Sequence, residues 1–381
     1  MNHTSLTNTM ADRDFEQVVV CRDPATGLES VIAVHDTTLG PALGGIRMRA
    51  YRDLDAAVAD ALDLAEAMTY KAALAGLDLG GGKSVINADP RRVDRERLIE
   101  AHARYIGTLG GRYIPAVDMG TTVHDLDIVG RHVTPVSGRR RDPSVFTAQG
   151  VVAAIRAAVT LRDGSTLSGV RVAVQGVGHV GRQVVALLAQ EGVEPYAADV
   201  DPARLDEVCR EFGATPVDVE DILAADVDVI APCAAGGVLD ERALDRLKAR
   251  YVVGAANNLL AHDAMPTRLT ERGIVHVPDF VANAGGLIAC EAEVRGDDSS
   301  LSADVEAIGH TTRAVLDRAL QTGADTVTVA IDLARSRIDA RRGARPFFRD
   351  RRRGSAMPIV TTPPTREPLL PRTPQAAGGP Q

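Results

Sequence analysis

Two lysines and an aspartate stand out in the first third of the chain, around a run of three glycines. Residues 71–83 read Lys-Ala-Ala-Leu-Ala-Gly-Leu-Asp-Leu-Gly-Gly-Gly-Lys, and Asp118 follows in Pro-Ala-Val-Asp-Met-Gly. Glycine lets a backbone and a ligand approach closely. A lysine that lies beside another cation or out of water has a lowered pKa and can act as a base. One lysine to hold a carboxylate and one to act as a base would suit amino-acid chemistry.

A phosphate-binding loop is the alternative interpretation of this stretch. Such a loop needs a glycine, four further residues and then Gly-Lys-Ser. Counting back from Gly82-Lys83-Ser84 places the required glycine at position 77, which is a leucine, and Gly76 misses by one residue. The spacing therefore argues against a nucleoside triphosphatase.

The bulk composition of the chain narrows the class of protein. A length of 381 residues predicts about two domains, and 45% apolar with 25% charged residues is ordinary for a soluble globular protein. The net charge of −8 argues against a general nucleic-acid binder. With 3% aromatic residues and no tryptophan, the chain lacks the stacking platforms that bind single strands. We therefore expect no nucleic-acid partner.

The cysteines and the N-terminus indicate a cytoplasmic protein. Cys21, Cys209, Cys233 and Cys290 are far apart and form no CxxC pair, so we expect neither a disulfide framework nor a metal site. The first ten residues are polar and contain no apolar signal core. No apolar run approaches the length of a membrane span, so we expect no membrane contact.

The pattern of the first domain, residues 15–137, is α/β. Residues 1–14 before it read as a flexible, polar leader. A helix capped by Asp53 or Asp55 would carry Lys71 near its C-terminal end. The inward stripe of this helix would consist of Val58, Leu62, Ala65 and Met68. The other predicted elements of this domain are strands at 17–21, 30–35, 84–87 and 113–117 and a helix at 94–109.

The second domain is predicted over residues 138–300, after a basic, proline-marked hinge at 138–146. A helix at 147–161 leads to a buried strand at 171–175, which Gly176-Val-Gly-His-Val-Gly181 follows at once. A second strand ends at Asp199, which completes a βαβ unit. The later predicted elements are strands at 227–231, 251–254 and 274–277 and, within the closing region 301–340, helices at 304–321 and 327–335. Residues 341–381, rich in arginine and proline, are expected to be disordered because they cannot bury enough apolar surface.

The glycines of the βαβ unit predict a Rossmann-like, doubly wound domain that binds NAD. They lie where a dinucleotide pyrophosphate needs them, at a helix N-terminus. Asp199 follows at the spacing of the carboxylate that binds the ribose hydroxyls of NAD and repels the extra phosphate of NADP. The nearby Asp201 and Arg204 leave the preference between the two cofactors open. Two loops at strand ends, Ala231–Gly237 and Gly254–Asn258, are further candidates for cofactor binding, although such loops are more often plain turns.

Several ordered motifs resemble the family of glutamate, leucine, phenylalanine and valine dehydrogenases over roughly residues 15–340. They are His35-Asp-Thr-Thr-Leu-Gly-Pro-Ala-Leu-Gly-Gly45, the Gly-Gly-Gly-Lys stretch, Arg112-Tyr with Asp118-Met-Gly-Thr-Thr, Ala-Pro-Cys-Ala at 231–234, Gly254-Ala-Ala-Asn-Asn258 and Val281-Ala-Asn-Ala-Gly-Gly286. The likeness is greatest to the leucine and valine enzymes. It implies an N-terminal substrate domain, a Rossmann-like NAD domain and a cleft between them.

The resemblance also implies an activity, the reversible oxidative deamination of an L-amino acid by NAD to a 2-oxo acid, ammonia and NADH. Carried onto this chain, Lys71 would bind the substrate carboxylate, Lys83 would activate water and Asp118 would transfer protons. Gly44, Gly45 and Asn283 would border the substrate, and Thr147 the nicotinamide. The residues expected at the cofactor are Gly176, Gly178, His179, Val180, Gly181, Asp199, Thr147, Ala231, Pro232, Cys233, Ala256, Asn257 and Asn283.

The resemblance places Leu43, Ala116, Leu287 and Cys290 around the substrate side chain. In the glutamate-specific relatives a lysine lies in the segment that matches 41–45, whereas this chain has Leu43 there. We therefore expect an aliphatic amino acid. One methylene changes binding by only about 1–3 kcal/mol, so valine, leucine, isoleucine and 2-aminobutyrate stay unseparated.

Three alternative functions remain open at the level of sequence: a phenylalanine-type enzyme, a glutamate-type enzyme and a catalytically silent sensor. The first two would carry out the same reaction with a different pocket for the substrate side chain. A catalytically silent NAD-binding sensor would keep the fold without the reaction, although the intact Lys71, Lys83 and Asp118 argue against it. A homo-oligomer is the default for this family, but the segments after Glu293 and beyond 340 depart from its pattern.

Overall fold

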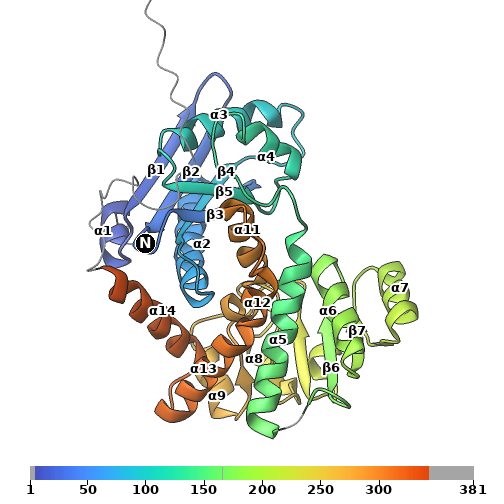
Figure 1. Cartoon of the computed structure of the whole chain (residues 1–381). Coiled ribbons are helices and arrows are strands. Elements are labelled where there is room, and N and C mark those ends of the chain that lie inside the picture. The colour runs from blue at the N-terminus through green and yellow to red at the C-terminus, as the bar shows by residue number, and fades with distance from the viewer. Residues whose placement is uncertain (1–4, 165, 343–381) are drawn as a thin grey trace, which may run out of the picture. The chain divides into compact units, whose positions relative to one another are not determined.

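The computed structural model describes residues 5–164 and 166–342, which form two α/β domains (Figure 1). The N-terminal domain holds a five-stranded sheet in the order β1-β2-β4-β3-β5. Strands β1, β2 and β4 pair antiparallel, whereas β3 pairs parallel with both β4 and β5. The elements of this domain are α1 (Leu6–Asp12), β1 (Gln17–Asp23), β2 (Leu28–Asp36), β3 (Ala42–Arg49), α2 (Leu54–Leu74), β4 (Gly80–Asn87), α3 (Arg95–Gly107), β5 (Tyr113–Val117) and α4 (Val123–Val129).

Helices cover both faces of this sheet. The small residues Ala57, Ala61 and Ala65 let α2 pack closely on one face, together with Leu62. Helices α3 and α4 cover the opposite face. The predicted cap is confirmed, because the Asp53 carboxylate accepts a hydrogen bond from the Ala56 N–H at 2.7 Å. At its other end α2 carries Lys71 in its last turn, as predicted.

The triple glycine is part of a strand, whereas the sequence predicts this strand only from Ser84. Strand β4 begins at Gly80 and is buried almost throughout. A Cβ atom at Gly81 would lie 2.2 Å from the backbone nitrogen of Thr69, so only glycine allows α2 to pack against this strand. These glycines thus serve helix–sheet packing rather than a flexible loop.

Three elements of this domain differ from the sequence prediction. The expected loose leader contains α1, which Ser5 caps through the Asn8 N–H. Strand β3 was not predicted, because two glycines interrupt its apolar alternation. Helix α4 was not predicted either, although Thr122 and Asp125 form a capping box at its start.

The second domain holds a fully parallel sheet of six strands in the order β11-β10-β9-β6-β7-β8. The chain starts in the middle with β6, builds outward to β8 and then returns to build the other half, which is the doubly wound Rossmann order. The predicted fold class is confirmed. The elements are α5 (Pro143–Asp163), β6 (Arg171–Gln175), α6 (His179–Gln190), β7 (Glu194–Ala198), α7 (Pro202–Phe212), β8 (Thr215–Pro216), the 3-10 helix η1 (Ile222–Ala224), β9 (Val229–Pro232), α8 (Glu241–Arg246), β10 (Tyr251–Val252), α9 (Met265–Glu271), β11 (Val275–His276), α10 (Asp279–Ala282) and α11 (Gly285–Arg295).

The chain then returns to the first domain through α12 (Leu301–Glu306), α13 (Ile308–Thr322) and α14 (Thr326–Arg342). Helix α14 packs on α2, and the Arg337 guanidinium donates to the carbonyls of Ala73 at 2.9 Å and Leu77 at 2.8 Å. Ala73 lies in the last turn of α2, where helix carbonyls lack partners, and Leu77 lies in the loop that follows this helix. Helix α14 extends to Arg342, into the segment predicted as a disordered tail. The rest of that tail lies outside the described residues.

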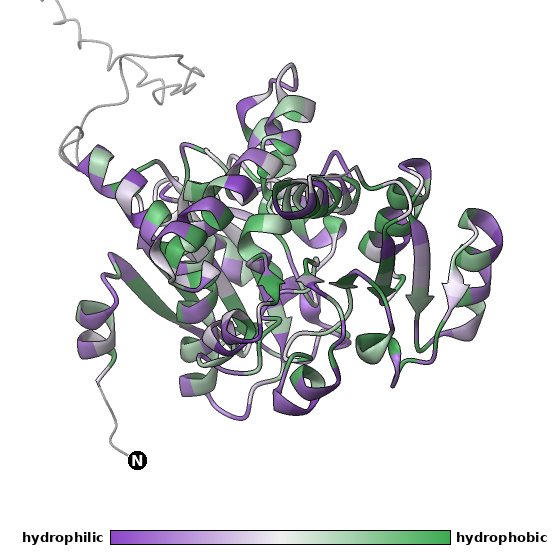
Figure 2. Cartoon of the chain, turned by 90° about the horizontal axis from the view of Figure 1, so that it is seen from below, coloured by the Kyte–Doolittle hydropathy of each residue, from purple (hydrophilic) through white to green (hydrophobic). Residues whose placement is uncertain are grey.

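Helix α5 has the length and composition to cross a membrane, the one such helix among the described residues. It packs against α6, α11 and α13, and 56% of its apolar window is buried. Most other helices carry both hydrophobic and hydrophilic residues, as Figure 2 shows. Packing inside the domain therefore accounts for the apolar character of α5.

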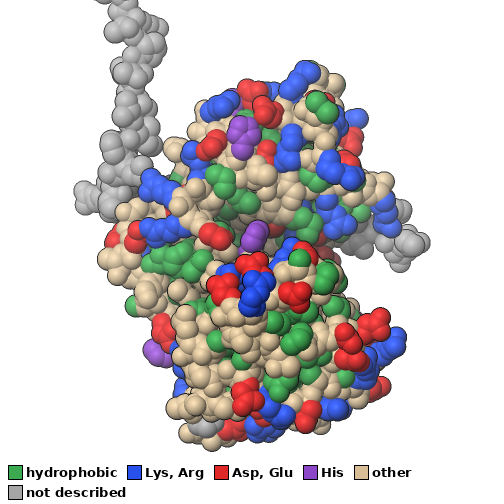
Figure 3. Space-filling view, turned by 90° about the vertical axis from the view of Figure 1, so that its right-hand side faces the viewer, with side chains coloured by type: hydrophobic (Ala, Val, Ile, Leu, Met, Phe, Trp, Pro, Cys, Tyr) green, Lys and Arg blue, Asp and Glu red, His purple; other side chains and the backbone are tan. Residues whose placement is uncertain are grey.

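Acidic and basic side chains lie next to one another on the surface. On the face shown in Figure 3, blue and red groups are interspersed. Ion pairs among the described residues include Arg139 with Asp127 at 2.5 Å and Arg250 with Asp163 at 2.9 Å. Arginine-rich surface segments are thus locally neutralised.

A buried histidine behind β4 makes folding depend on pH. His102 on α3 lies between the hydroxyls of Ser30 and Ser84, at 3.0 and 2.9 Å, and burial lowers its pKa to about 3. The unfolded chain binds a proton below about pH 6.5 that the folded chain rejects, so stability falls as pH drops from 6.5 toward 3. We expect His102→Gln to remove about 2 kcal/mol of the stability difference between pH 7 and pH 5.

Urea unfolding at both pH values and one fixed protein concentration measures this effect. The exposed His124 provides a matched His→Gln substitution outside the core. An equal pH dependence in wild type and His102→Gln would contradict the assignment.

Candidate active site

Parallel strands bring Lys83 and Asp118 together across β3. Strands β4 and β5 flank β3, and Ile46 pairs with Ser84 on one side and Val117 on the other. Lys83 precedes Ser84 on β4, and Asp118 is the first residue after the end of β5. The Lys83 Nζ lies 2.5 Å from the Asp118 Oδ2.

Two glycines of β3 make this approach possible. A Cβ atom at Gly45 would lie 2.5 Å from the Cβ of Asp118, and one at Gly44 would lie 1.6 Å from the carbonyl oxygen of Gly82. The Tyr113 hydroxyl holds β3 in place by donating a hydrogen bond to the Gly44 carbonyl at 2.7 Å. Any side chain at either glycine would therefore displace Asp118 or separate β3 from β4.

Lys83 is buried, Asp118 is partly buried, and the two form an ion pair. Lys83 is only 6% exposed, and burial lowers the pKa of its ammonium group against the opposing effect of Asp118. Burial also favours the neutral form of Asp118, but Lys83 and Arg47 outweigh it and hold the pKa of this carboxyl below its usual range. The site therefore combines an ionised carboxylate with a lysine that loses its proton more readily than usual.

Lys71 lies near this pair without a direct ion partner. Among the described residues its ammonium group forms no hydrogen bond or salt bridge. Burial lowers its pKa to about 8, Asp279 of the second domain opposes this, and Lys83 reinforces it. A desolvated cation with no salt bridge is suited to hold the carboxylate of a ligand.

Sequence reasoning missed four residues around this centre. They are Arg47, Asp60, Tyr51 and Asp279. Arg47 was the most accessible to prediction, because a charge in a mostly apolar strand next to Gly44-Gly45 is unusual. Asp60 and Tyr51 carry no such signal, since both look like ordinary surface residues of a helix and a turn.

The glycine loop after β6 has the geometry of a pyrophosphate site. Gly176 adopts φ = +87°, and a Cβ at Gly181 would lie 1.9 Å from the Gly176 carbonyl oxygen. A Cβ at Gly178 would instead meet open space in front of the N-terminus of α6. The tight turn, the helix–strand contact and the open approach are the three roles of glycine in dinucleotide binding.

Asp199, the residue expected at the ribose, lies beside this loop. Its Oδ2 accepts from the Val177 N–H at 2.8 Å, and its Oδ1 accepts from the Asp201 N–H at 2.9 Å. The Arg204 guanidinium lies 3.6 Å from the Asp199 carboxylate. The structure therefore brings an acidic and a basic group together beside the glycine loop.

The loops at the ends of β9 and β10 meet the glycine loop. The Cys233 N–H donates to the Gln175 carbonyl at 2.7 Å, and the Ala256 N–H donates to the Pro232 carbonyl at 3.0 Å. The Cys233 thiol stays neutral because burial raises its pKa to about 12. Ala231 is fully buried in β9, so its side chain belongs to the core. His179 and Val180 occupy the first turn of α6.

Asn283 has an unused acceptor at the centre of these loops. Its amide nitrogen donates to the Ala255 carbonyl at 3.0 Å and to the Asn257 Oδ1 at 2.8 Å, whereas its Oδ1 is buried without a partner among the described residues. Thr147, near the start of α5, faces Gly286 close by. A buried acceptor that lacks a partner calls for a donor from a ligand. Together with the open glycine loop, it fits a bound dinucleotide and its substrate.

The four residues expected around a substrate side chain lie in one apolar region. Leu43, Ala116 and Leu287 belong to the same buried cluster, and Cys290 packs against it. Burial raises the pKa of the Cys290 thiol to about 11, so this side chain is uncharged at neutral pH. The Ser137 hydroxyl joins the two domains here by donating to the Cys290 carbonyl at 2.8 Å.

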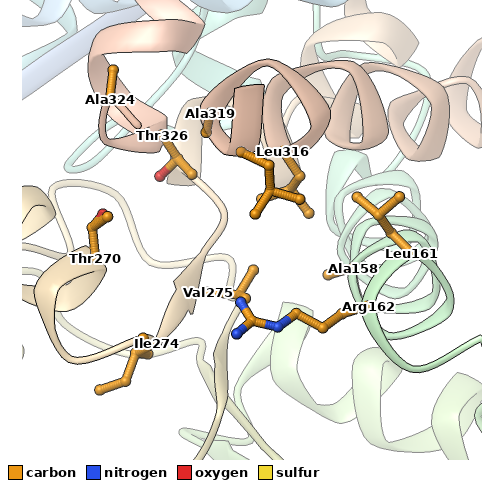
Figure 4. Close-up of a pocket in the computed structure, with 12 residues that line it drawn as sticks. Ala158, Leu161, Arg162, Thr270, Ile274, Val275, Leu316, Ala319, Ala324 and Thr326 are labelled. Carbon is orange, nitrogen blue, oxygen red and sulfur yellow. The ribbon is translucent and has the colours of Figure 1, made fainter. Parts of the chain in front are cut away.

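A cavity of about 240 Å³ lies elsewhere in the second domain (Figure 4). Its walls come from the last turns of α5, from β11 and from the C-terminal half of α13, with the Arg162 guanidinium extending into it. Ala158 on this wall is about 17 Å along α5 from Thr147, given the rise of a helix. The cavity is therefore separate from the lysines and the glycine loop.

Comparison with known sequences identifies the family. The profile described as "Glu/Leu/Phe/Val dehydrogenase, dimerisation domain" matches residues 15–134, and the one described as "Glutamate/Leucine/Phenylalanine/Valine dehydrogenase" matches residues 199–337. The chain belongs to the glutamate/leucine/phenylalanine/valine dehydrogenase family. The resemblance drawn from the sequence motifs is confirmed.

Individual relatives of this amino-acid dehydrogenase align over nearly their whole length. Leucine dehydrogenase of Bacillus subtilis (strain 168) is 42% identical over 347 residues, which cover 89% of this chain and 95% of that protein. Valine dehydrogenase of Streptomyces virginiae is 42% identical over 341 residues, which cover 86% and 94%. The crystal structure of L-tryptophan dehydrogenase from Nostoc punctiforme matches with a TM-score of 0.80 at 37% identity, covering 88% of this chain and 99% of that chain. A dehydrogenase of this family uses a nicotinamide cofactor.

The glycine loop offers a matched pair of substitutions. Gly178→Ala should lower the affinity for NADH at least about tenfold, because its methyl group would occupy the open space in front of α6 while the fold is unaffected. Gly181→Ala should instead lower the melting temperature by several degrees, because its methyl group would collide with the Gly176 carbonyl.

Fluorescence titration with NADH and thermal unfolding of both variants measure the two effects. Wild-type affinity in Gly178→Ala would show that no pyrophosphate binds at this loop.

Proposed function

We propose that this enzyme catalyses the reversible, NAD-dependent oxidative deamination of a branched-chain or other aliphatic L-amino acid to the 2-oxo acid, ammonia and NADH. The observation that carries the proposal is the Lys83–Asp118 ion pair, with a buried lysine, and beside it Lys71, which has no ion partner among the described residues. This arrangement provides one cation for a carboxylate and two groups that can exchange protons. The names of the leucine and valine dehydrogenases that align with the chain support the substrate class.

Each group has a distinct role in the proposed reaction. The Lys71 ammonium holds the substrate carboxylate, and Asn283 holds the substrate amino group through its free Oδ1. A bound nicotinamide cofactor would supply the acceptor for the hydride of the α-carbon. Lys83, whose pKa is lowered, takes a proton from the water that attacks the resulting imine. Asp118 accepts a proton from the amino group and returns it to the departing ammonia.

The apolar surroundings of Leu43 and Ala116 favour an aliphatic side chain over that of glutamate. A second carboxylate at this position would be buried without a cation, which costs several kcal/mol. An aromatic substrate is the second candidate, because L-tryptophan dehydrogenase from Nostoc punctiforme aligns with this chain as fully as the aliphatic enzymes do.

The quaternary state and the compartment extend the proposal. The N-terminal profile carries the description of a dimerisation domain, which supports a homo-oligomer. All four cysteines are free thiols, which supports a reducing cytoplasm. We assign the enzyme neither a nucleic-acid nor a membrane partner.

The first test is NADH formation by the purified enzyme with a panel of L-amino acids. We expect turnover with valine, leucine or isoleucine and none with glutamate. Lys83→Ala should lower kcat about 10²–10⁴-fold, the usual contribution of a general base, without a change in NADH affinity. The exposed Lys248 supplies the matched control, and Lys248→Ala should keep full activity.

Turnover with tryptophan or phenylalanine alone would replace the aliphatic assignment by the aromatic one. Full activity of Lys83→Ala would refute the proposed mechanism. Binding of NADH without turnover of any amino acid would favour a silent sensor.

The preference for NAD depends on the charge of Asp199. Asp199→Asn keeps an acceptor for the Val177 N–H but removes the charge that would repel a 2′-phosphate. Because Arg204 lies next to it, the variant should use NADP at least about tenfold better relative to NAD. Kinetics with both cofactors measure this ratio, and an unchanged ratio would remove Asp199 from the ribose site.

A further inference from the structure

Asp118 is held by two cations rather than one. The Arg47 Nε lies 3.1 Å from the Asp118 Oδ2, which is the same oxygen that Lys83 contacts at 2.5 Å. Arg47 is on β3, next to Ile46, and its side chain is only 13% exposed. The carboxylate is thus shared between a lysine and an arginine in a desolvated place. Lys83 does not have this counter-ion to itself.

Arg47 is in turn held by a carboxylate on α2. Its Nη1 lies 3.0 Å from the Asp60 Oδ2, and the Tyr51 hydroxyl donates to the same oxygen of Asp60. The contacts form a continuous series from Tyr51 through Asp60, Arg47 and Asp118 to Lys83. Two carboxylates therefore hold the guanidinium in one orientation, and Tyr51 in turn holds one of them, Asp60. A guanidinium cannot lose its charge at neutral pH.

We propose that Arg47 and Asp60 are positioning residues, which hold the Asp118 carboxylate in place and set the balance of charge at Lys83. This inference rests on the proposed function, because it concerns the base and the proton carrier of that reaction. Arg47 competes with Lys83 for Asp118 and so favours the neutral, basic form of the lysine. Asp60 partly neutralises Arg47 and so limits this effect.

Charges on the surrounding elements do not replace either residue. Lys71 on α2 and Asp279 on α10 face the site, but Asp279 lies with Lys71 rather than with Arg47. The buried Tyr113 on β5 stays neutral, because burial raises the pKa of its hydroxyl. Arg47 lowers the pKa of Lys83, whereas Asp60 raises it. Replacing Arg47 and replacing Asp60 are therefore expected to shift the pKa of Lys83 in opposite directions.

The test compares Arg47→Met with Asp60→Asn in the pH profile of kcat/KM for oxidative deamination. In Arg47→Met the rise of activity that reports the lysine base should move to higher pH by about one unit, and in Asp60→Asn it should move to lower pH by about half a unit. Damage to the local packing alone would lower activity in both variants without shifts of opposite sign. Arg47→Lys keeps the charge without the fork, and its profile should lie between those of wild type and Arg47→Met.

A second measurement reads the lysine without any turnover. The chain contains only three lysines, Lys71, Lys83 and Lys248. Competitive acetylation over a range of pH, followed by mass spectrometry, gives the relative reactivity of each, with the exposed Lys248 as the internal reference. The reactivity of Lys83 should show the same opposite shifts in the two variants.

Each outcome separates this inference from the proposed function. If the wild type turns over amino acids but neither variant shifts, or both shift in the same direction, the positioning role is wrong. If the wild type turns over no amino acid, the proposed function fails, and the acetylation profiles alone decide on Arg47 and Asp60. If Arg47→Met does not fold, the shifts of Arg47→Lys and Asp60→Asn decide.

Discussion

The site depends on keeping two ammonium groups out of water. Burial lowers the pKa of both Lys71 and Lys83, and only Asp118 makes a direct ion pair with either of them among the described residues. The composition of the chain makes this choice conspicuous, because 40 of its 43 basic residues are arginine. Arginine remains charged in any environment, whereas a desolvated lysine can become a base. Two of the three lysines of the chain thus lie at this site, where burial makes the loss of the ammonium proton easier.

The glycines follow from this constraint. A buried lysine needs a carboxylate at close range, and Asp118 reaches Lys83 only because Gly45 has no side chain. Lys71 needs a helix that lies directly on the sheet, and Gly81 permits this contact with Thr69. The triple glycine that suggested a ligand-binding loop therefore acts through packing of the protein on itself. The close packing of α2 on β4 that these glycines permit places Lys71 near Lys83 and Asp118.

The sequence predicted the elements that have a strong local signal. Strands 113–117 and 171–175 and the cap at Asp53 agree with the structure, because their apolar runs and turn residues are unambiguous. Strand β3 was missed because Gly44 and Gly45 break its pattern, although parallel pairing with two neighbours overrides their low propensity. Tertiary pairing of this kind has no local signature.

The same limit applies to the site. Lys71, Lys83 and Asp118 could be named from their motifs, and the structure brings them together. Asp60 and Tyr51 could not, because their importance arises only from contacts between β3, α2 and the turn that joins them, and the charge of Arg47 next to Gly44-Gly45 was the one signal that went unused. Asp279 comes from a different domain, 208 positions after Lys71, and no spacing rule covers such a distance.

The balance of charge gives a physical reason for the proposed substrate. Lys71, Lys83 and Arg47 face Asp118 and Asp60, whereas burial raises the pKa of Asp279 and makes it the weakest of the counter-charges. Lys83 and Arg47 are both engaged by carboxylates of the protein, whereas Lys71 makes no ion pair among the described residues. Lys71 therefore has no ion pair to break before it binds the carboxylate of a substrate. A second carboxylate would find only Leu43 and its apolar neighbours. An amino acid with an uncharged side chain satisfies both conditions, whereas glutamate satisfies only the first.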